Sequence, residues 1–553
     1  MRLPEINSAR IDRRTAIKGG TAAVLLTGAA AAAVTALDST VARAEASVFR
    51  HGIASGDPLP SGVIIWTRVT PSEDALPGSG AGAPVTVHWE LARDESFGSV
   101  VASGTHTATA DSDHTVKVDV TGLAPGSDYC YRFTALDQTS PIGRTRTAPA
   151  TGDTPDRLRF GVVSCANWEA GFFSAYRHLA DRGDLDAIVH LGDYLYEYGN
   201  GEYGGRNGSV RWHQPAHEII SLADYRIRHA QYKTDPDLAN LHTLLPFICT
   251  WDDHETADDT WSGGAENHNP GDGDWETRCE AARQAYLEWM PVRAGADRRL
   301  YRRLRFGTLA ELSMLDLRSY RSEQVHAGPG WRQVDDPNRT ITGKDQMDWV
   351  TNALVSAPVR WKLVGNPVMI SPLVFPPLDP ASTAALTELI GIPDAGIPAN
   401  LDQWDGYTAD RQRLLGAITD NQVSDVVFLT GDIHTSWAAD VPTVAATYPA
   451  CRTAGVEFVV PSVTSDSMGD MTKTPPRTAS LMAEGAIRGV NRHLGYIELD
   501  SHGYGVLHVD AEQAQMDWFY VSEVSNPNAG VRHGASFAVR RGGRLEPRPG
   551  PIV

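Results

Sequence analysis

Apolar residues follow two kinds of pattern along the chain, and the change comes near residue 150. Short β-rich runs at 63–69, 85–91 and 115–120 partly alternate between apolar and polar residues, with turns rich in Gly, Pro, Asp and Ser between them. Such runs predict the short strands of an all-β domain. After a Pro/Thr/Gly-rich stretch at 147–155, continuous apolar runs alternate with helical patterns, which predicts an α/β region.

The first region is predicted to form a small β-sandwich over residues 45–150. Its segment 122–133 places a Pro-Gly turn before a strand that contains Tyr129 and Tyr131. This arrangement resembles the late strands of fibronectin/Ig-like sandwiches. Domains of this kind usually carry no chemistry.

The second region, residues 151–553, is predicted to be one large α/β domain. Buried strands are expected at 158–164, 185–191, 245–251, 361–365, 425–430 and 456–460, and helices at 171–182, 222–241 and 275–290. The first strand, helix and strand form a βαβ unit. Two late strands, near 495–499 and 504–509, suggest mixed or antiparallel pairing at the end of the domain.

The first residues indicate a targeting segment. Arg13 and Arg14 precede an Ala-rich stretch at 20–37, and small residues around 42–44 supply a cleavage point. We predict that residues 1–44 are a cleaved twin-arginine signal, that the export machinery is a partner, and that the protein is secreted or lies at the cell-envelope exterior. A transmembrane anchor is the alternative, but the stretch is only mildly apolar, so we expect no integral membrane span after processing.

The composition is that of an acidic globular protein. The chain has 553 residues, of which 42% are hydrophobic and 21% charged, and its formal net charge is −19. An acidic protein is a poor non-specific binder of nucleic acid, so we expect no stable nucleic-acid partner. If the substrate is an anion, bound cations are the simplest means of reversing the local field.

Polar residues follow five of the predicted strands at their carboxyl ends, where open α/β sheets place ligands. These five stations are Ser164-Cys165-Ala166-Asn167, Gly192-Asp193-Tyr194-Leu195-Tyr196-Glu197, Trp251-Asp252-Asp253-His254-Glu255, Gly365-Asn366-Pro367 and Gly431-Asp432-Ile433-His434. Each alone is a weak signal, because a Gly-Asp after a strand is usually an ordinary turn. Together they predict a metal site, since hard cations take oxygen ligands and His adds a nitrogen donor.

The stations resemble those of the calcineurin-like metallophosphoesterases, with three of that group's His ligands replaced. Cys165-Ala166-Asn167 stands where D-x-H belongs, Asp253-His254-Glu255 resembles N-H-E, and Asp432-Ile433-His434 resembles H-x-H. The same replacements, with a preceding β-sandwich and a twin-arginine signal, are similar to the PhoD-type alkaline phosphatases and phosphodiesterases. The segments 315–321 and 404–407 also look familial.

The resemblance implies a site with one Fe³⁺ and two Ca²⁺ ions. The ligand chemistry agrees, because a thiolate and a phenolate favour Fe³⁺ while Asp-rich positions favour Ca²⁺ over Zn²⁺. The predicted metal ligands are Cys165, Asp193, Tyr196, Asp253, Asp432 and His434, with Asn167 and Asn366 as weaker candidates. Asp193 is the expected bridge between ions.

The implied reaction is hydrolysis of phosphate monoesters, diesters or both. A metal-bound hydroxide or oxide would attack phosphorus in line. His254 and the adjacent Asp253 are the predicted catalytic residues, and His254 protonates the leaving alkoxide or hydrogen-bonds a phosphoryl oxygen. Small phosphate esters or phospholipids are the expected substrates.

Two alternatives remain at this stage. The first keeps the site and changes the substrate, as a phospholipase D-like phosphodiesterase that acts on lipid headgroups; access through loops 199–211 and 266–275 would decide it. The second is an adhesion or carbohydrate-binding protein with a degenerate enzyme domain, which the intact stations disfavour. The odd number of cysteines, Cys130, Cys165, Cys249, Cys279 and Cys451, leaves the pairing among them open.

Overall fold

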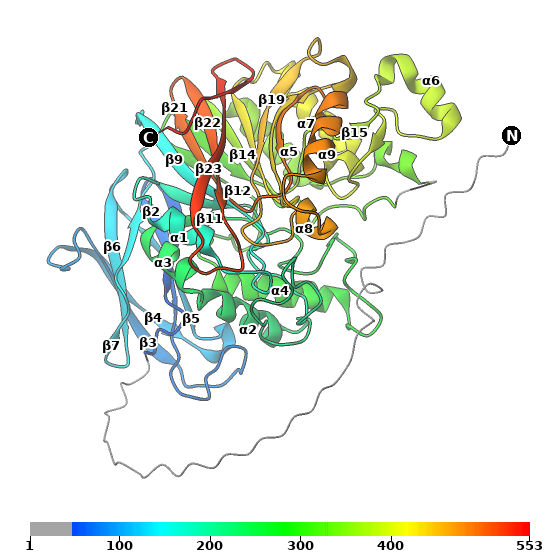
Figure 1. Cartoon of the computed structure of the whole chain (residues 1–553). Coiled ribbons are helices and arrows are strands. Elements are labelled where there is room, and N and C mark those ends of the chain that lie inside the picture. Colours follow the sequence, from blue (N-terminus) through cyan, green and yellow to red (C-terminus); the bar gives the residue numbers. More distant parts are fainter. Residues whose placement is uncertain (1–46, 327, 329, 553) are drawn as a thin grey trace. The chain divides into compact units, whose positions relative to one another are not determined.

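Two large β-sheets dominate the computed structural model, which describes residues 47–326, 328 and 330–552 (Figure 1). The expected signal at 1–44 lies outside the described residues. The ten-stranded sheet runs in the order β24 (Leu545–Pro547), β23 (Val531–Arg540), β22 (Gln513–Val521), β21 (Gly503–Asp510), β9 (Arg157–Val163), β10 (Ala187–His190), β11 (Pro246–Cys249), β1 (Ile53–Leu59), β2 (Gly62–Arg68) and β5 (Thr115–Thr121). Its centre, β9-β10-β11, is parallel, as the βαβ pattern predicts.

The seven-stranded sheet runs β12 (Arg302–Phe306), β13 (Ala310–Met314), β14 (Trp361–Asn366), β17 (Val426–Thr430), β19 (Thr453–Val459), β18 (Ser436–Pro442) and β20 (Leu494–Glu498). Two short strands, β15 (Val374–Phe375) and β16 (Ile397–Pro398), pair with each other. The late strands are antiparallel, β20 to β18 and β21 to β9. The expected mixed pairing is confirmed.

The inner faces of the two sheets form one apolar core. Phe160 and Val189 of the larger sheet belong to the same buried cluster as Leu312, Leu363 and Leu429 of the smaller one. Four helices, α1 (Ser174–Ala180), α2 (Leu222–Lys233), α3 (Pro236–Leu244) and α4 (Trp275–Trp289), supply the cluster on the outer face of the larger sheet. Helices α5 (Lys344–Ser356) and α7 (Thr408–Asp420) cover the smaller sheet, so the predicted α/β sandwich is confirmed.

The N-terminal β-sandwich is present and shares one of its sheets with the α/β region. Its own sheet contains β4 (Val100–Ala108), β3 (Val85–Ala92), β6 (Asp128–Ala135), β7 (Gln138–Thr139) and β8 (Gly143–Arg146). The facing layer is β1, β2 and β5, and β1 pairs in parallel with β11. A continuous sheet therefore crosses the expected boundary at residue 150.

The turn before β6 has the hydrogen bonding that its sequence suggests. The Tyr129 hydroxyl accepts a hydrogen bond from the backbone N–H of Ala124 at 2.9 Å. Such a tyrosine corner ties the turn to the strand that follows it.

The helix expected over 222–241 is in fact two helices, α2 and α3. Asp235 caps α3 by accepting hydrogen bonds from the N–H groups of Asp237 and Leu238, and Pro236 occupies the first turn. Proline lacks the N–H that a continuous helix would need and fits the first turn, where that N–H has no partner. The apolar period continues across this break, so periodicity alone did not reveal it.

Three further helices lie in the second half, α6 (Pro380–Ile390), α8 (Met468–Thr472) and α9 (Ala479–Val490). All five cysteines are unpaired in the structure. Among the described residues, none of the helices combines the length and hydropathy that crossing a bilayer requires.

The pairing of β1 with β11 can be tested at Gly56. A β-carbon there would lie 2.1 Å from the carbonyl oxygen of Pro291 and 2.7 Å from that of Phe247. Both obstacles are backbone, so we expect Gly56→Ala to lower the free energy of unfolding by about 1–3 kcal/mol, as overpacked sites do.

The matched control is Gly416→Ala in α7, where a β-carbon meets nothing within 4 Å. It should be neutral or slightly stabilising, because Ala favours helix over Gly. Equal melting temperatures for the two variants, measured by circular dichroism, would contradict the close approach at β1.

Candidate metal centre

The structure brings the predicted strand-end residues together at one edge shared by both sheets. Cys165 follows β9, Asp193 follows β10 and Asp253 follows β11, all in the larger sheet. Asp432 and His434 follow β17 of the smaller sheet. The centre therefore depends on the packing of the two sheets against each other.

Four of these residues have left-handed backbone conformations. The φ angles are 60° at Cys165, 53° at Asp193, 67° at Asp432 and 54° at His434. Residues with a β-carbon rarely adopt such angles, and each costs of the order of 1–3 kcal/mol. A β-carbon at Gly192, whose φ is 108°, would lie 2.5 Å from the β-carbon of Asp252, so only glycine allows the two strand ends to approach.

One cluster of donor atoms surrounds Asp193. The ligand atoms of Cys165, Asp193 and His434 lie within 4.8 Å of one another. The Tyr196 hydroxyl donates to Oδ2 of Asp193 at 3.1 Å and lies 3.3 Å from Nε2 of His434. Nδ1 of His434 lies 2.8 Å from the carbonyl oxygen of Asp466, a contact that fixes the ring and directs Nε2 into the cluster.

Carboxylates extend the centre beyond this first cluster. Three further groups have ligand atoms within 4.8 Å of one another: Asp193 with Asp253 and His254, Asp252 with Asp253 and Asp432, and Asp253 with Asp258 and Asp259. Asp193 and Asp253 each belong to more than one group. Both are therefore placed to bridge neighbouring cations.

The electrostatics of the centre fit bound cations. Burial raises the pKa of Asp193, Cys165 and Tyr196 well above their ordinary values, and the neighbouring acids raise them further. Oδ1 of Asp193 is buried and has no hydrogen-bond partner. A buried oxygen without a hydrogen-bond partner destabilises the folded protein unless it binds another group. A cation held among these anionic donors would be such a group.

Arg318 is the main protein cation in the centre. It makes a two-point ion pair with Asp252, with Nη2 to Oδ2 at 3.0 Å, and it also donates to Asp402 at 2.9 Å and to Asp432 at 3.2 Å. Its side chain is fully buried. Burial alone would lower the pKa of Arg318, but these carboxylates hold it well above its usual range.

His254 lies against the ring of Tyr196, with 4.1 Å between centroids. Its Nδ1 is 2.8 Å from Oε2 of Glu197. Glu197 is held in turn, because its Oε1 accepts from the N–H of Asp258 at 2.9 Å and from Nδ2 of Asn267 at 2.8 Å. Burial would lower the pKa of His254, but the carboxylates of Asp253 and Glu197 outweigh it and raise that pKa well above its ordinary value.

The two asparagines have other partners in the structure. Oδ1 of Asn366 accepts a hydrogen bond from the Trp404 indole at 2.9 Å, and Oδ1 of Asn167 accepts from the N–H of Glu169 at 2.9 Å. In both asparagines the side-chain oxygen, which would be the metal ligand, already accepts a hydrogen bond. Their metal ligation stays a prediction.

Several functional residues were missed by reasoning from sequence. Glu197 and Glu255 stand inside the quoted stations, and Arg318 stands inside the segment 315–321, so a signal was present for all three. Glu255 accepts from the N–H groups of Asp193 and Asp252, which locks two strand ends together. Ser465, which donates to the Tyr196 hydroxyl at 2.6 Å, follows no predicted strand closely and gave no signal.

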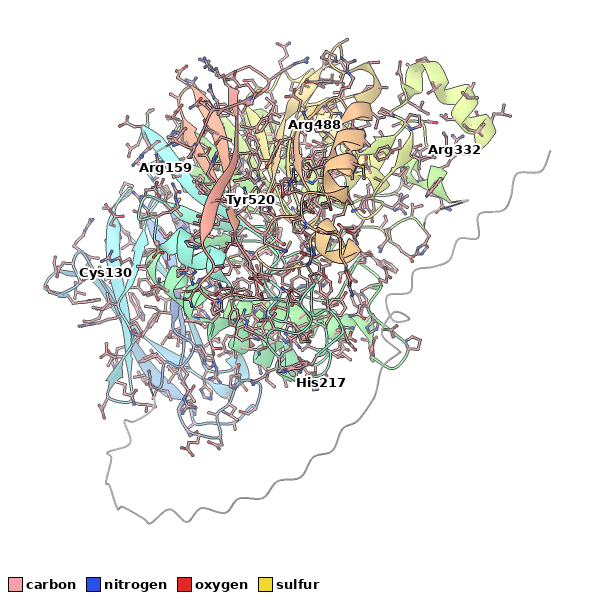
Figure 2. The ribbon with its side chains drawn as sticks, in the orientation of Figure 1. Cys130, Arg159, His217, Arg332, Arg488 and Tyr520 are labelled. Atoms are coloured by element: carbon pink, nitrogen blue, oxygen red, sulfur yellow. The ribbon has the colours of Figure 1, made fainter. Side chains whose placement is uncertain are left out.

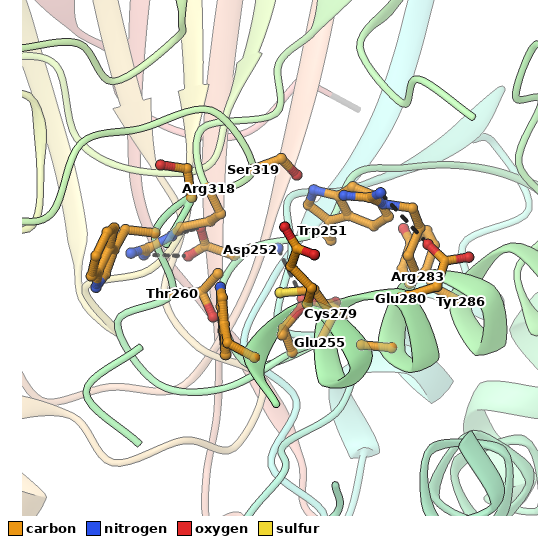
Figure 3. Close-up of a pocket in the computed structure, with 16 residues that line it drawn as sticks. Trp251, Asp252, Glu255, Thr260, Cys279, Glu280, Arg283, Tyr286, Arg318 and Ser319 are labelled. Carbon is orange, nitrogen blue, oxygen red and sulfur yellow. Dashed lines mark hydrogen bonds and ion pairs between the residues drawn. The ribbon is translucent and has the colours of Figure 1, made fainter. Parts of the chain in front are cut away.

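A cavity of about 400 Å³ adjoins the centre on the side of α4. Figure 3 shows Asp252 and Arg318 on one side of it and Glu280, Arg283 and Tyr286 of α4 on the other. The ion pair between Asp252 and Arg318 thus forms part of the cavity wall.

The fold and the site together define a class of protein: an α/β sandwich with a carboxylate-rich candidate metal centre at the strand ends. The family model described as PhoD-like phosphatase matches residues 160–518, and the model of its N-terminal domain matches residues 32–149. The chain belongs to the PhoD-like phosphatase family. It is a phosphate-ester hydrolase.

Two similar proteins agree with this membership. Alkaline phosphatase D from Bacillus subtilis (strain 168) is 36% identical over 504 residues, which are 89% of this chain and 81% of that protein. A solved structure described as PhoD is similar with a TM-score of 0.81 and 34% identity, and the match covers 92% of this chain and 94% of that one. The overall fold is therefore shared along nearly the whole chain.

The role of Arg318 yields a prediction about stability. In Arg318→Met the carboxylates of Asp252, Asp402 and Asp432 lose their buried cation, so the free energy of unfolding should fall by about 3–5 kcal/mol. Bound metal, measured by elemental analysis, should also fall. The control is Arg144→Met, whose pair with Glu95 is exposed and whose loss should barely change the melting temperature. Similar melting temperatures for the two variants would argue against Arg318 as the balancing charge.

Proposed function

We propose that the protein hydrolyses phosphate esters with metal ions held at this centre. The observation that carries the proposal is the convergence of Cys165, Tyr196, His434 and at least four aspartates at one shared sheet edge, with an unpartnered buried oxygen on Asp193. Such a set binds cations, and cations bind phosphate. When bound, the ions would offset the charge of the phosphoryl group and lower the pKa of the attacking water.

We propose that Fe³⁺ binds at the cluster of Cys165, Asp193, Tyr196 and His434. Thiolate and phenolate donors favour Fe³⁺. The carboxylate groups around Asp253 and Asp432 offer only oxygen atoms, which favour Ca²⁺, in two sites. Asp193 and Asp253, each shared between groups, would bridge these positions.

Some residues of the centre would hold the metal ions, and others would supply a proton to the leaving group. Asp193, Asp253 and Asp432 position the ions. His254 protonates the leaving alkoxide. Glu197 orients the imidazole of His254 through its 2.8 Å contact with Nδ1, which leaves Nε2 free to face the substrate. Tyr196, whose ring lies 4.1 Å from the ring of His254 between centroids, keeps that ring in place.

Small phosphate monoesters and diesters are the proposed substrates, with phospholipid headgroups as the second candidate. The two loops expected to control access do border the centre. Tyr203 of loop 199–211 lies 5.7 Å from the Tyr196 ring, centroid to centroid, and Asn267 of loop 266–275 binds Glu197. Turnover of a matched monoester and diester pair with the same alcohol tests the proposal and ranks the two classes. Failure to hydrolyse either compound with metals loaded would refute it.

We further propose export by the twin-arginine route, supported by Arg13, Arg14 and the apolar stretch after them. That route carries folded proteins, which suits a centre that is loaded with metal before export.

If both kinds of ion are present, the absorption band of iron and the activity that depends on Ca²⁺ should respond differently to chelation. The purified enzyme should contain iron and show a visible charge-transfer band that Tyr196→Phe shifts or removes. EGTA should remove Ca²⁺ and activity while the band persists, and added Ca²⁺ should restore activity without iron, because oxygen-only sites exchange more readily. Val101→Ala, an exposed change on β4, is the control and should alter neither. A colourless, iron-free and fully active enzyme would disprove the iron site.

The division of labour predicts different losses at His254 and Asp193. In His254→Ala the metal content should persist while turnover falls by about 10²–10⁴, the usual scale for a general acid. The loss should shrink with nitrophenyl esters, whose leaving group needs no proton. In Asp193→Ala both metal and turnover should be lost. Equal metal loss in the two variants would make His254 a ligand.

A further inference from the structure

Helix α9 packs Ala483 and Ile487 against the core but leaves other apolar side chains exposed. Its polar residues Ser480 and Glu484 are buried, whereas Leu481, Met482 and Val490 are exposed, Met482 by 75%. Surface helices normally bury the apolar stripe and expose the polar one. An apolar face left outside marks an interaction surface.

The inward polar side of α9 is fully engaged, so the helix is fixed in this orientation. Glu484 receives two hydrogen bonds from Arg477 and one from the N–H of Leu499 at 3.1 Å. Ser480 donates to Asp500 at 2.5 Å. Turning the apolar face inward would leave these groups buried without partners, which costs more than the exposure does.

The short helix α8 extends the same apolar surface. Met468 is 38% and Met471 50% exposed. We refer to Met468, Met471, Leu481 and Met482 together as the apolar face. Methionine side chains adapt to irregular partners.

Within the segment that contains α8 and α9, the exposed charged side chains are basic. Between residues 468 and 492 the exposed charged side chains are Lys473, Arg488 and Arg492, and the acids Asp470 and Glu484 are buried. Arg488 projects from α9 in Figure 2. The chain as a whole carries −19, so this basic segment stands against an acidic background. Apolar side chains flanked by Lys and Arg suit a surface of anionic lipid headgroups.

The inner side of the α8 and α9 segment contacts residues of the metal centre. Helix α8 begins directly after Ser465 and Asp466, which bind Tyr196 and His434. Ile487 of α9 packs in the same cluster as Ile433, the residue between Asp432 and His434.

We propose that α8 and α9 dock the enzyme on an anionic phospholipid bilayer, so that phosphate esters at that surface reach the metal centre. The inference builds on the proposed phosphoesterase activity and adds where the substrate is presented. Docking itself requires only the apolar face and its basic flank.

The test is co-flotation of the full metal-loaded protein with vesicles of phosphatidylglycerol and phosphatidylcholine in equal parts. The unchanged protein should bind, and Leu481→Ser with Met482→Ser should weaken binding by at least about tenfold, because each apolar side chain contributes roughly that factor. Arg488→Gln with Arg492→Gln should weaken it several-fold, and added salt should reproduce that loss. The control, Val100→Ser with Val101→Ser, removes two exposed apolar residues on β4 and should bind as the unchanged protein does.

Hydrolysis of a water-soluble short ester separates the two proposals. It should be unchanged in every variant, since none of the altered residues belongs to the metal centre, and this also shows that the variants are folded. Vesicle binding with no ester hydrolysis would refute the phosphoesterase and leave docking intact. Equal vesicle binding by the α9 and β4 variants would refute docking, as would a dimer in sedimentation that Met482→Ser dissociates with no change in vesicle binding.

Discussion

Repulsion between buried carboxylates is the constraint on which the structure of the centre depends. Asp193, Asp252 and Asp253 are buried in one small volume, and the partly buried Asp402 and Asp432 lie beside them. Arg318 offsets part of this charge, and Glu255 and Glu197 are held by backbone N–H groups. The negative charge that remains would be neutralised by bound cations. Protein stability and metal binding therefore depend on the same electrostatic balance.

The arrangement of the sheets explains why such a balance is possible. Neither sheet alone supplies the whole ligand set, because Cys165 and Asp193 come from one and Asp432 and His434 from the other. The apolar core between the sheets holds these strand ends in register, and four left-handed residues turn their side chains into the same space. Strain at the strand ends is tolerated because the packing behind it is strong.

The sequence allowed the sandwich, the α/β region and six of the proposed ligands to be predicted, because buried strands and the polar residues after them follow simple periodic rules. It did not show that β1 joins the larger sheet beside β11, since no local pattern identifies a strand's neighbour. Arg318 was visible only as part of a familiar segment. Its role depends on contacts with residues 66, 84 and 114 positions away, which only the folded chain brings together.

The pairing of β1 with β11 also makes the N-terminal strands a cover for the catalytic sheet. Without them the backbone N–H and C=O groups of β11 would form an open edge, and open edges recruit strands from other molecules. The hydrolase half of the chain would then be prone to edge-to-edge aggregation even with its centre intact. In this family member the β-sandwich therefore helps to keep the protein soluble. Replacing it with an unrelated N-terminal domain would leave the edge of β11 exposed.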